Sequence, residues 1–208
     1  MSPELKDKLA IRELVENWVL WRDACLWQKF RTVWWDEGVM MATWTQGTAD
    51  QFIAMSREGF AKGVRILHFL GGSSIELEGD RAVVQTKMTI SQRAEVHGVL
   101  CDVVCTGRFY DFLEKRKPGK KSARWGFVLR QPIYEKDRMD PVMPGTWPIL
   151  DQAKLAKFPE GYRYLGYLQS HIGYPVKLDS PGLIGPETDR LYKTGAAWLR
   201  GEKLNWRK

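Results

Sequence analysis

Apolar and polar residues alternate over the last part of the segment Leu67–Ile90. This pattern constrains the fold more than any other feature of the chain. One face of the extended run carries Ala82, Val84, Thr86, Met88 and Ile90, whereas the other face is mostly polar. A Glu-Gly-Asp sequence at 78–80 separates this run from an earlier extended run that begins beside His68. The segment therefore predicts a half-buried antiparallel hairpin with a histidine at its entrance.

The predicted elements change from helices to strands along the chain. Ser2 and Pro3 are typical of a helix start, and Thr48 or Asp50 is expected to cap a later helix. In chain order we expect helices over 2–25 and 26–36, a strand over 39–44, a helix over 47–63, the hairpin, and strands over 96–114 and 124–135. This order predicts an α+β fold, with N-terminal helices packed over a curved, cone-shaped antiparallel sheet whose interior suits a small molecule.

The composition of the chain changes after Asp140, where prolines and glycines become frequent. We expect one domain over residues 1–140 and an extension over residues 141–208 that packs on this domain or on a neighbouring subunit. The extension contains several tyrosines and a predicted helix over 186–199, which argue against a disordered tail.

Charge and cysteine content exclude several classes of protein. The formal net charge is +7, but lysines and arginines are spread along the chain, and the densest run, Lys115–Lys121, is typical of a solvated loop. We therefore expect no nucleic-acid partner. The three cysteines lack metal-type spacing, and neither a signal peptide nor a run of membrane-spanning length is evident, so we expect a cytoplasmic protein with no membrane association.

Two residues in apolar surroundings are candidates for chemistry. His68 lies between Leu67 and Phe69, and Asp23 lies near the end of the buried face of the first helix. A buried carboxylate needs a cationic or hydrogen-bonding partner, and an aspartate beside a histidine would make the imidazole a better general base. Taken separately, a buried structural histidine and an outward-pointing aspartate remain open alternatives.

Other polar groups are more ambiguous. Asp102 interrupts an apolar strand and faces either the cavity or, equally, a neighbouring strand on the outside. Arg130 is either a donor to a developing oxyanion or a surface residue. The chain contains no metal-binding motif, no phosphate-binding glycine loop and no Gly-x-Ser-x-Gly sequence, so we expect no metal and no nucleotide cofactor.

Several short motifs together resemble the SnoaL-like family, in the superfamily of nuclear transport factor 2 and ketosteroid isomerase. The motifs are Ile11-Arg12-Glu13-Leu14, Asp23, Trp27, Leu67-His68-Phe69-Leu70-Gly71, Ile75-Glu76, Gly79-Asp80, Ala82-Val83 and Gly107-Arg108-Phe109-Tyr110. The resemblance covers residues 5–136 and implies a cystatin-like roll.

Within this family the chain is most similar to cofactor-independent lyases such as scytalone dehydratase, bile acid 7-alpha-dehydratase and hexachlorocyclohexane dehydrochlorinase. The resemblance implies that Asp23 and His68 form a catalytic dyad and that Asp102 is a further active-site residue. Trp18 replaces a tyrosine of the bile acid enzyme, and Gln92 stands where scytalone dehydratase has a second histidine. Substrate-activating hydroxyls are therefore either missing or supplied from elsewhere, with Tyr110, Tyr134 and the C-terminal extension as candidates.

The resulting hypothesis is a lyase or isomerase that acts on an aromatic, polyketide or steroid-like molecule without a cofactor. Asp23 and His68 are its expected catalytic residues. The expected substrate-binding residues are Trp18, Asp102, Tyr110, Arg130 and Tyr134. Two alternatives remain: a non-catalytic ligand-binding or dimerisation module, and the small subunit of a ring-hydroxylating dioxygenase. The resemblance also implies a homodimer or homotrimer.

Overall fold

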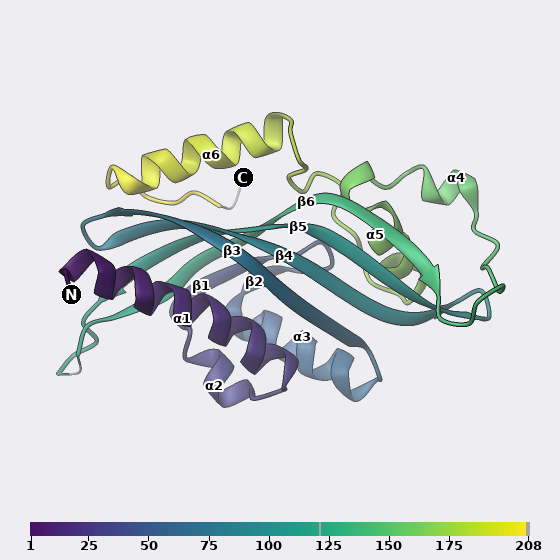
Figure 1. Ribbon diagram of the computed structural model, residues 1–208, viewed down its shortest axis with the longest axis horizontal. Coiled ribbons are helices and arrows are strands. Elements are labelled where there is room, and N and C mark those ends of the chain that lie inside the picture. Colours follow the sequence, from purple (N-terminus) through teal and green to yellow (C-terminus); the bar gives the residue numbers. More distant parts are fainter. Residues whose placement is uncertain (121, 207–208) are drawn as a thin grey trace.

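Helices precede a long sheet in the computed structural model, which describes residues 1–120 and 122–206 (Figure 1). The elements are α1 (Pro3–Asp23), α2 (Trp27–Arg31), β1 (Trp34–Met41), β2 (Gln46–Thr48), α3 (Ala49–Ala61), β3 (Arg65–Glu78), β4 (Arg81–Val96), β5 (Val99–Arg116), β6 (Arg124–Pro141), α4 (Gln152–Leu155), the 3-10 helix η1 (Glu160–Tyr162), α5 (Arg163–His171) and α6 (Pro186–Leu199). The expected α+β class is confirmed.

The described strands form one curved, unclosed sheet in the order β2-β1-β6-β5-β4-β3. Strands β3 to β6 follow one another as an antiparallel meander, whereas β1 pairs with β6 in parallel. Helices α1, α2 and α3 lie on one side of the sheet, and α6 lies on the opposite side (Figure 1). The sheet thus separates an inner core beneath the N-terminal helices from an outer cluster beneath α6.

Helix α1 begins where the sequence predicts. The Ser2 side chain accepts a hydrogen bond from the Leu5 backbone N–H at 3.2 Å, and Pro3 occupies the first turn, where a missing N–H costs nothing. Its buried face consists of Ile11, Val15, Trp18, Val19 and Arg22. This spacing places the end of the helix, and Asp23 with it, against the start of β3.

The predicted helix over 26–36 is too long, and the predicted strand over 39–44 starts too late. Helix α2 ends at Arg31, and β1 already begins at Trp34. The Trp34 ring packs 5.1 Å from the Phe127 ring, because β1 pairs with β6 at this point. A contact distant in sequence therefore overrides the local helical pattern. The short strand β2 was not predicted, but Thr48 caps α3 as expected.

The predicted hairpin is confirmed and is longer than expected. Its turn lies at Gly79, which has a φ of +56°, and Glu78 pairs with Arg81 across it. Strand β4 continues past Ile90 to a second tight turn at His97 and Gly98, which both have positive φ, as a two-residue type I′ turn requires.

The neighbouring strands also exceed their predicted ends. Strand β5 runs to Arg116 and β6 to Pro141, so the basic run expected to form a loop at 115–121 begins within a strand. Lys121 lies outside the described residues. The longer strands extend the sheet beyond the helices that cover its middle (Figure 1).

Residues 142–206 contact the domain that precedes them at several places. The Thr43 hydroxyl donates a hydrogen bond to Gln169 Oε1 at 2.7 Å, and the Lys177 backbone N–H donates to the Thr43 carbonyl at 2.8 Å. The Leu165 N–H donates to Asp137 Oδ2 at 2.7 Å. Helix α6 has the predicted bounds, whereas α4, η1 and α5 were not predicted, since each is short or interrupted by glycine.

We predict that Gly107→Ala destabilises the protein by about 3 kcal/mol, because a Cβ atom at this position would overlap with the Ile133 backbone carbonyl on the paired strand. Gly72→Ala is the matched control on β3, since no atom lies within 4 Å of a Cβ there. Its unfolding free energy should stay within about 0.5 kcal/mol of the wild type. Equal urea-unfolding midpoints for the two variants would contradict this prediction.

Candidate active site

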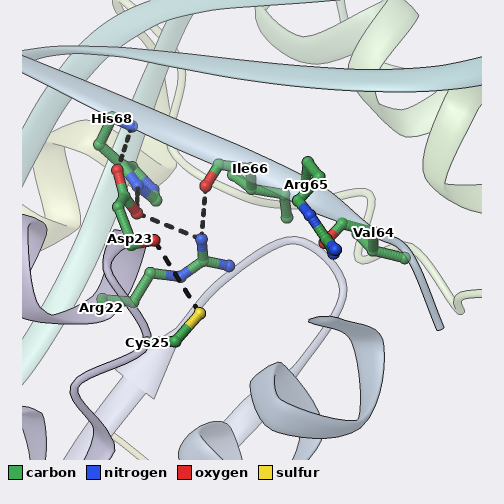
Figure 2. A network of polar contacts seen from close by, with 7 residues as sticks. All are labelled: Arg22, Asp23, Cys25, Val64, Arg65, Ile66 and His68. Carbon is green, nitrogen blue, oxygen red and sulfur yellow. Dashed lines mark hydrogen bonds and ion pairs between the residues drawn. The ribbon is translucent and has the colours of Figure 1, made fainter. Parts of the chain in front are cut away.

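Asp23 and His68 come from two elements that meet at the edge of the sheet. Asp23 is the last residue of α1, and His68 lies on β3, where Leu67 and Phe69 point to the opposite, exposed face. Asp23 Oδ1 lies 2.9 Å from His68 Nδ1, and Asp23 Oδ2 accepts a hydrogen bond of 2.6 Å from the His68 backbone N–H (Figure 2). The pairing expected from the sequence is therefore present.

This geometry selects one tautomer of the imidazole. An ionised carboxylate only accepts hydrogen bonds, so His68 Nδ1 carries the proton and Nε2 is left as the basic nitrogen. Within the described residues, Nε2 makes no hydrogen bond. The ring is positioned by Asp23 at one nitrogen and is available to a ligand at the other.

Burial and hydrogen bonding act in opposite directions on the two groups. Burial lowers the pKa of His68, and the hydrogen bond and charge of Asp23 offset this only in part. For Asp23, burial alone would raise the pKa, but the hydrogen bonds and charges of His68 and Arg22 more than offset it, so the pKa is lowered. At neutral pH the pair is therefore a neutral imidazole beside an ionised carboxylate.

Arg22 is a third member of this network that the sequence reasoning did not single out. Its Nη1 donates to Asp23 Oδ1 at 3.2 Å and to the Ile66 carbonyl at 2.6 Å (Figure 2). Burial lowers the pKa of its guanidinium, and the charge of Asp23, which acts to raise this pKa, offsets the effect only in part. A signal was present in the sequence, since Arg22 continues the spacing of Ile11, Val15 and Trp18 on the buried face of α1.

His68 faces a narrow inner cavity with aromatic walls. The indole of Trp18 meets its ring edge to face at 5.5 Å between centroids, and Phe109 lies at 5.9 Å. Tyr134 also lines this cavity, and its hydroxyl accepts a hydrogen bond of 3.3 Å from the Thr43 backbone N–H. The volume of this cavity is about 30 Å³, enough for one or two water molecules.

A second hollow, the mouth, adjoins this inner cavity. The two share Arg22, Trp44, Ile66 and Gln169 in their walls. The remaining wall of the mouth includes Gln92 on β4 and Tyr174, which follows α5. Residues of the C-terminal extension therefore complete the site that α1 and the sheet begin.

Asp102 lies away from the cavity, contrary to the expectation drawn from the resemblance. Its carboxylate accepts two hydrogen bonds of 2.7 Å from Arg93, which stands directly opposite on β4. The alternation along β5 buries Cys101 and Val103 and turns Asp102 to the outer face. The outward-facing alternative, which the sequence left equally open, is the correct one.

Tyr110 also lies on the outer face and does not line the cavity. It directly follows Phe109, which faces inward, so the strand alternation turns Tyr110 toward α6. Its ring packs 5.5 Å from Tyr192, and its hydroxyl abuts Gly195. Of the two tyrosines named from the sequence, Tyr134 alone lines the inner cavity.

Arg130 is fully buried and supports the cavity wall from within the core. Its guanidinium donates hydrogen bonds of 2.7 and 2.8 Å to the two oxygens of Asp111, which is also fully buried. The same guanidinium lies 4.3 Å from the Trp18 ring centroid and 4.0 Å from that of Phe109. Arg130 is therefore neither at the surface nor part of the cavity lining that includes His68.

Residues 1–120 and 122–206 contain neither a cluster of metal-binding side chains nor a helix suited to cross a membrane. No group of three or more His, Cys, Asp or Glu side chains there is placed to share a metal ion. No helix in these residues combines the length and the apolar character needed to cross a membrane.

A comparison of the sequence with known protein families places the chain in one of them. The model of the SnoaL-like domain matches residues 3–131, and the chain belongs to this family, within the NTF2-like superfamily.

One relative is Pea pathogenicity protein 2 of Fusarium vanettenii, with 39% identity over 209 residues, 95% of this chain and 88% of that protein. Two solved structures share the fold. A candidate scytalone dehydratase of Novosphingobium aromaticivorans has a TM-score of 0.54 at 16% identity, over 71% of this chain and 96% of its own. Type 2 hexachlorocyclohexane dehydrochlorinase (LinA) has a TM-score of 0.53 at 11% identity, over 72% of this chain and 96% of its own.

We predict that Arg130→Met destabilises the protein by about 3–5 kcal/mol, because Asp111 would be left as an unpaired buried carboxylate. The double variant Asp111→Leu, Arg130→Met removes both charges and should regain much of this loss. Urea unfolding of the two variants and the wild type measures the difference. A single variant as stable as the wild type would show that the ion pair does not support the wall.

The contribution of His68 to the unfolding free energy should fall as the pH drops below 6.5. The folded state lowers the pKa of His68, so the unfolded chain binds protons more readily below the ordinary value of 6.5 and gains stability relative to the folded state. His68→Gln should make this part of the pH dependence shallower in urea unfolding at pH 7.5 and 5.5. The same slope in variant and wild type would contradict the prediction.

Proposed function

We propose that this protein is a cofactor-independent lyase of the dehydratase type, or an isomerase, acting on a hydrophobic small molecule. The observation that carries the proposal is the 2.9 Å contact between His68 Nδ1 and Asp23 Oδ1 beside a cavity with aromatic walls. A histidine oriented by a carboxylate at one nitrogen and open to a ligand at the other is suited to proton transfer.

In the proposed reaction, Nε2 of His68 removes a proton from a carbon next to a carbonyl group. Asp23 stabilises the imidazolium that forms, since its carboxylate already accepts hydrogen bonds from the protonated Nδ1 and from the backbone N–H of His68. For a dehydration, the carbon–hydroxyl bond then breaks, a carbon–carbon double bond forms, and the imidazolium returns its proton to the leaving hydroxide to give water. No electrons are gained or lost, so the reaction needs no redox cofactor.

The lowered pKa of His68 supports this role. A general base must be unprotonated, and burial lowers the imidazole pKa below its ordinary value, so His68 is neutral throughout the neutral range. The wall of Trp18, Phe109 and Tyr134 favours an aromatic or polycyclic substrate.

The named relatives support the proposal at different levels. LinA is named as a dehydrochlorinase, an elimination catalyst, but at 11% identity it contributes the fold alone. Pea pathogenicity protein 2 is much more similar, and its name states no reaction. The proposed chemistry therefore depends on the geometry of Asp23 and His68 in this chain.

One observation favours the second candidate, a ligand-binding module without catalysis. The inner cavity has room for only one or two water molecules, so a substrate would have to displace side chains of the cavity wall to reach His68. The mouth is no larger, at about 20 Å³, so a ligand would have to displace side chains there as well, although it would not need to reach His68.

Deuterium exchange tests the proposal without knowledge of the natural substrate. The protein is incubated in D₂O with a panel of aromatic and polycyclic ketones, and mass spectrometry follows exchange at carbons next to the carbonyl. We predict protein-catalysed exchange with at least one ketone, a loss of at least about 10²-fold in His68→Ala, and a similar loss in Asp23→Asn.

His171→Ala is the matched control, because this histidine ends α5 and lines neither the inner cavity nor the mouth. Circular dichroism and thermal unfolding establish that each variant is folded. Saturable ketone binding with exchange that is equal in the wild type and His68→Ala would support the binding module instead.

A further inference from the structure

Buried polar atoms without a hydrogen-bond partner gather around the candidate site. Within the described residues eight such side-chain atoms occur, and none is a carboxylate or carbonyl oxygen. Four belong to residues that line the inner cavity or the mouth: Trp18 Nε1, Arg22 Nε, Ser56 Oγ and Gln92 Nε2. Three of these are donors only, and the serine hydroxyl is able to donate. The site is therefore supplied with hydrogen-bond donors that the protein itself leaves unused.

No carboxylate of the described residues lines the space around these donors, although the ionised carboxylate of Asp23 pairs with Arg22 beside it. Within the described chain, Arg22 and His68 are the basic residues that line the inner cavity or the mouth. No described Asp or Glu belongs to either lining. Arg22 is the residue shared by both hollows that carries a charge.

Arg22 retains hydrogen-bonding capacity for such a ligand. Its Nη1 serves both Asp23 and the Ile66 carbonyl, whereas Nε has no partner. In Figure 2 the second terminal nitrogen points away from Asp23. The carboxylate of Asp23 is moreover shared with two donors of His68, so it does not satisfy the guanidinium alone. An anionic oxygen placed beside Arg22 would give the guanidinium a second partner.

Ser56 and Gln92 add donors on the side of the mouth. Ser56 lies on α3 and is 5% exposed, and Gln92 lies on β4 and is 1% exposed. The Oε1 atom of Gln92 lies 3.5 Å from Gln169 Nε2, which turns the free Nε2 of Gln92 away from that residue. Both residues line the mouth beside Arg22.

We propose that Arg22, Ser56 and Gln92 form a subsite that binds an anionic oxygen of the ligand, from a carboxylate or an ionised phenol. The ligand is then an aromatic acid or phenol whose apolar part reaches toward Trp18 and His68 by displacing side chains of the cavity wall, since the inner cavity itself holds only one or two water molecules. This inference rests on the proposed function in placing the ligand in the same site, but binding does not require turnover. The net charge of +7 also favours the approach of an anion.

Isothermal titration with 1-naphthoate and 1-naphthamide tests the subsite, since the two probes differ chiefly in charge. We expect the acid to bind the protein at least tenfold more tightly than the amide. Arg22→Gln should abolish this preference and Arg22→Lys should restore part of it. Arg12→Gln, which replaces an exposed arginine on α1 that pairs with Glu16, is the matched control and should keep the full preference.

A titration of 4-nitrophenol, whose absorbance reports its ionisation, distinguishes the two sources of negative charge. Preferential binding of the ionised phenol with a weak response to naphthoate assigns the subsite to a phenolate, and the reverse result assigns it to a carboxylate. If Arg22→Gln does not fold, Ser56→Ala and Gln92→Leu replace it, each with an expected loss of at least threefold in affinity for the preferred anion.

The inference is overturned if neither anion binds more tightly than its neutral form, or if the folded Arg22→Gln protein keeps the preference. The anion-binding and ketone-exchange assays together separate this outcome from the fate of the proposed function. A protein that prefers the anion but shows no ketone exchange retains the subsite and loses the proposed chemistry. A protein that catalyses exchange without any anion preference retains the proposed chemistry and loses the subsite.

Discussion

The carboxylate of Asp23 joins the end of α1 to the edge strand β3, and the candidate site depends on this connection. One oxygen faces the imidazole of His68 and the guanidinium of Arg22, and the other accepts the backbone N–H of His68. Since β3 is an edge strand of the described sheet, it pairs with β4 on one edge and has no strand partner on the other. The hydrogen bonds of Asp23 and Arg22 therefore set both the helix position and the orientation of the imidazole.

Behind this network, a second buried ion pair supports the cavity wall. Arg130 and Asp111 are fully buried, and the guanidinium lies against the faces of Trp18 and Phe109, which in turn contact His68. Burial raises the pKa of Asp111 against the effect of Arg130, so the pair survives in the core because both oxygens are hydrogen bonded. An arginine that resembles an oxyanion donor in sequence thus has a supporting position here.

Much of the fold was predictable because its signals are local. The alternation before Ile90, the turn at Gly79 and the caps at Ser2 and Thr48 each follow from a few neighbouring residues. The early start of β1 was not predictable, because Trp34 is placed by its pairing with β6, far along the chain. The local sequence left the pairing of Asp23 with His68 as one possibility among several, and the resemblance to the SnoaL-like family favoured it, because the contact joins two elements that are distant in sequence.

Local sequence patterns were enough to predict the α+β class, the hairpin and the bounds of α6, and they marked Asp23 and His68 as candidates. The tertiary structure alone decided which polar residues face the cavity. Asp102 and Tyr110 point outward because a strand turns successive side chains to opposite faces, and only the packed helices reveal which face is inner. Arg22 and Gln92 enter the site for the same reason: a cavity is a property of several elements together, and no single stretch of sequence encodes it.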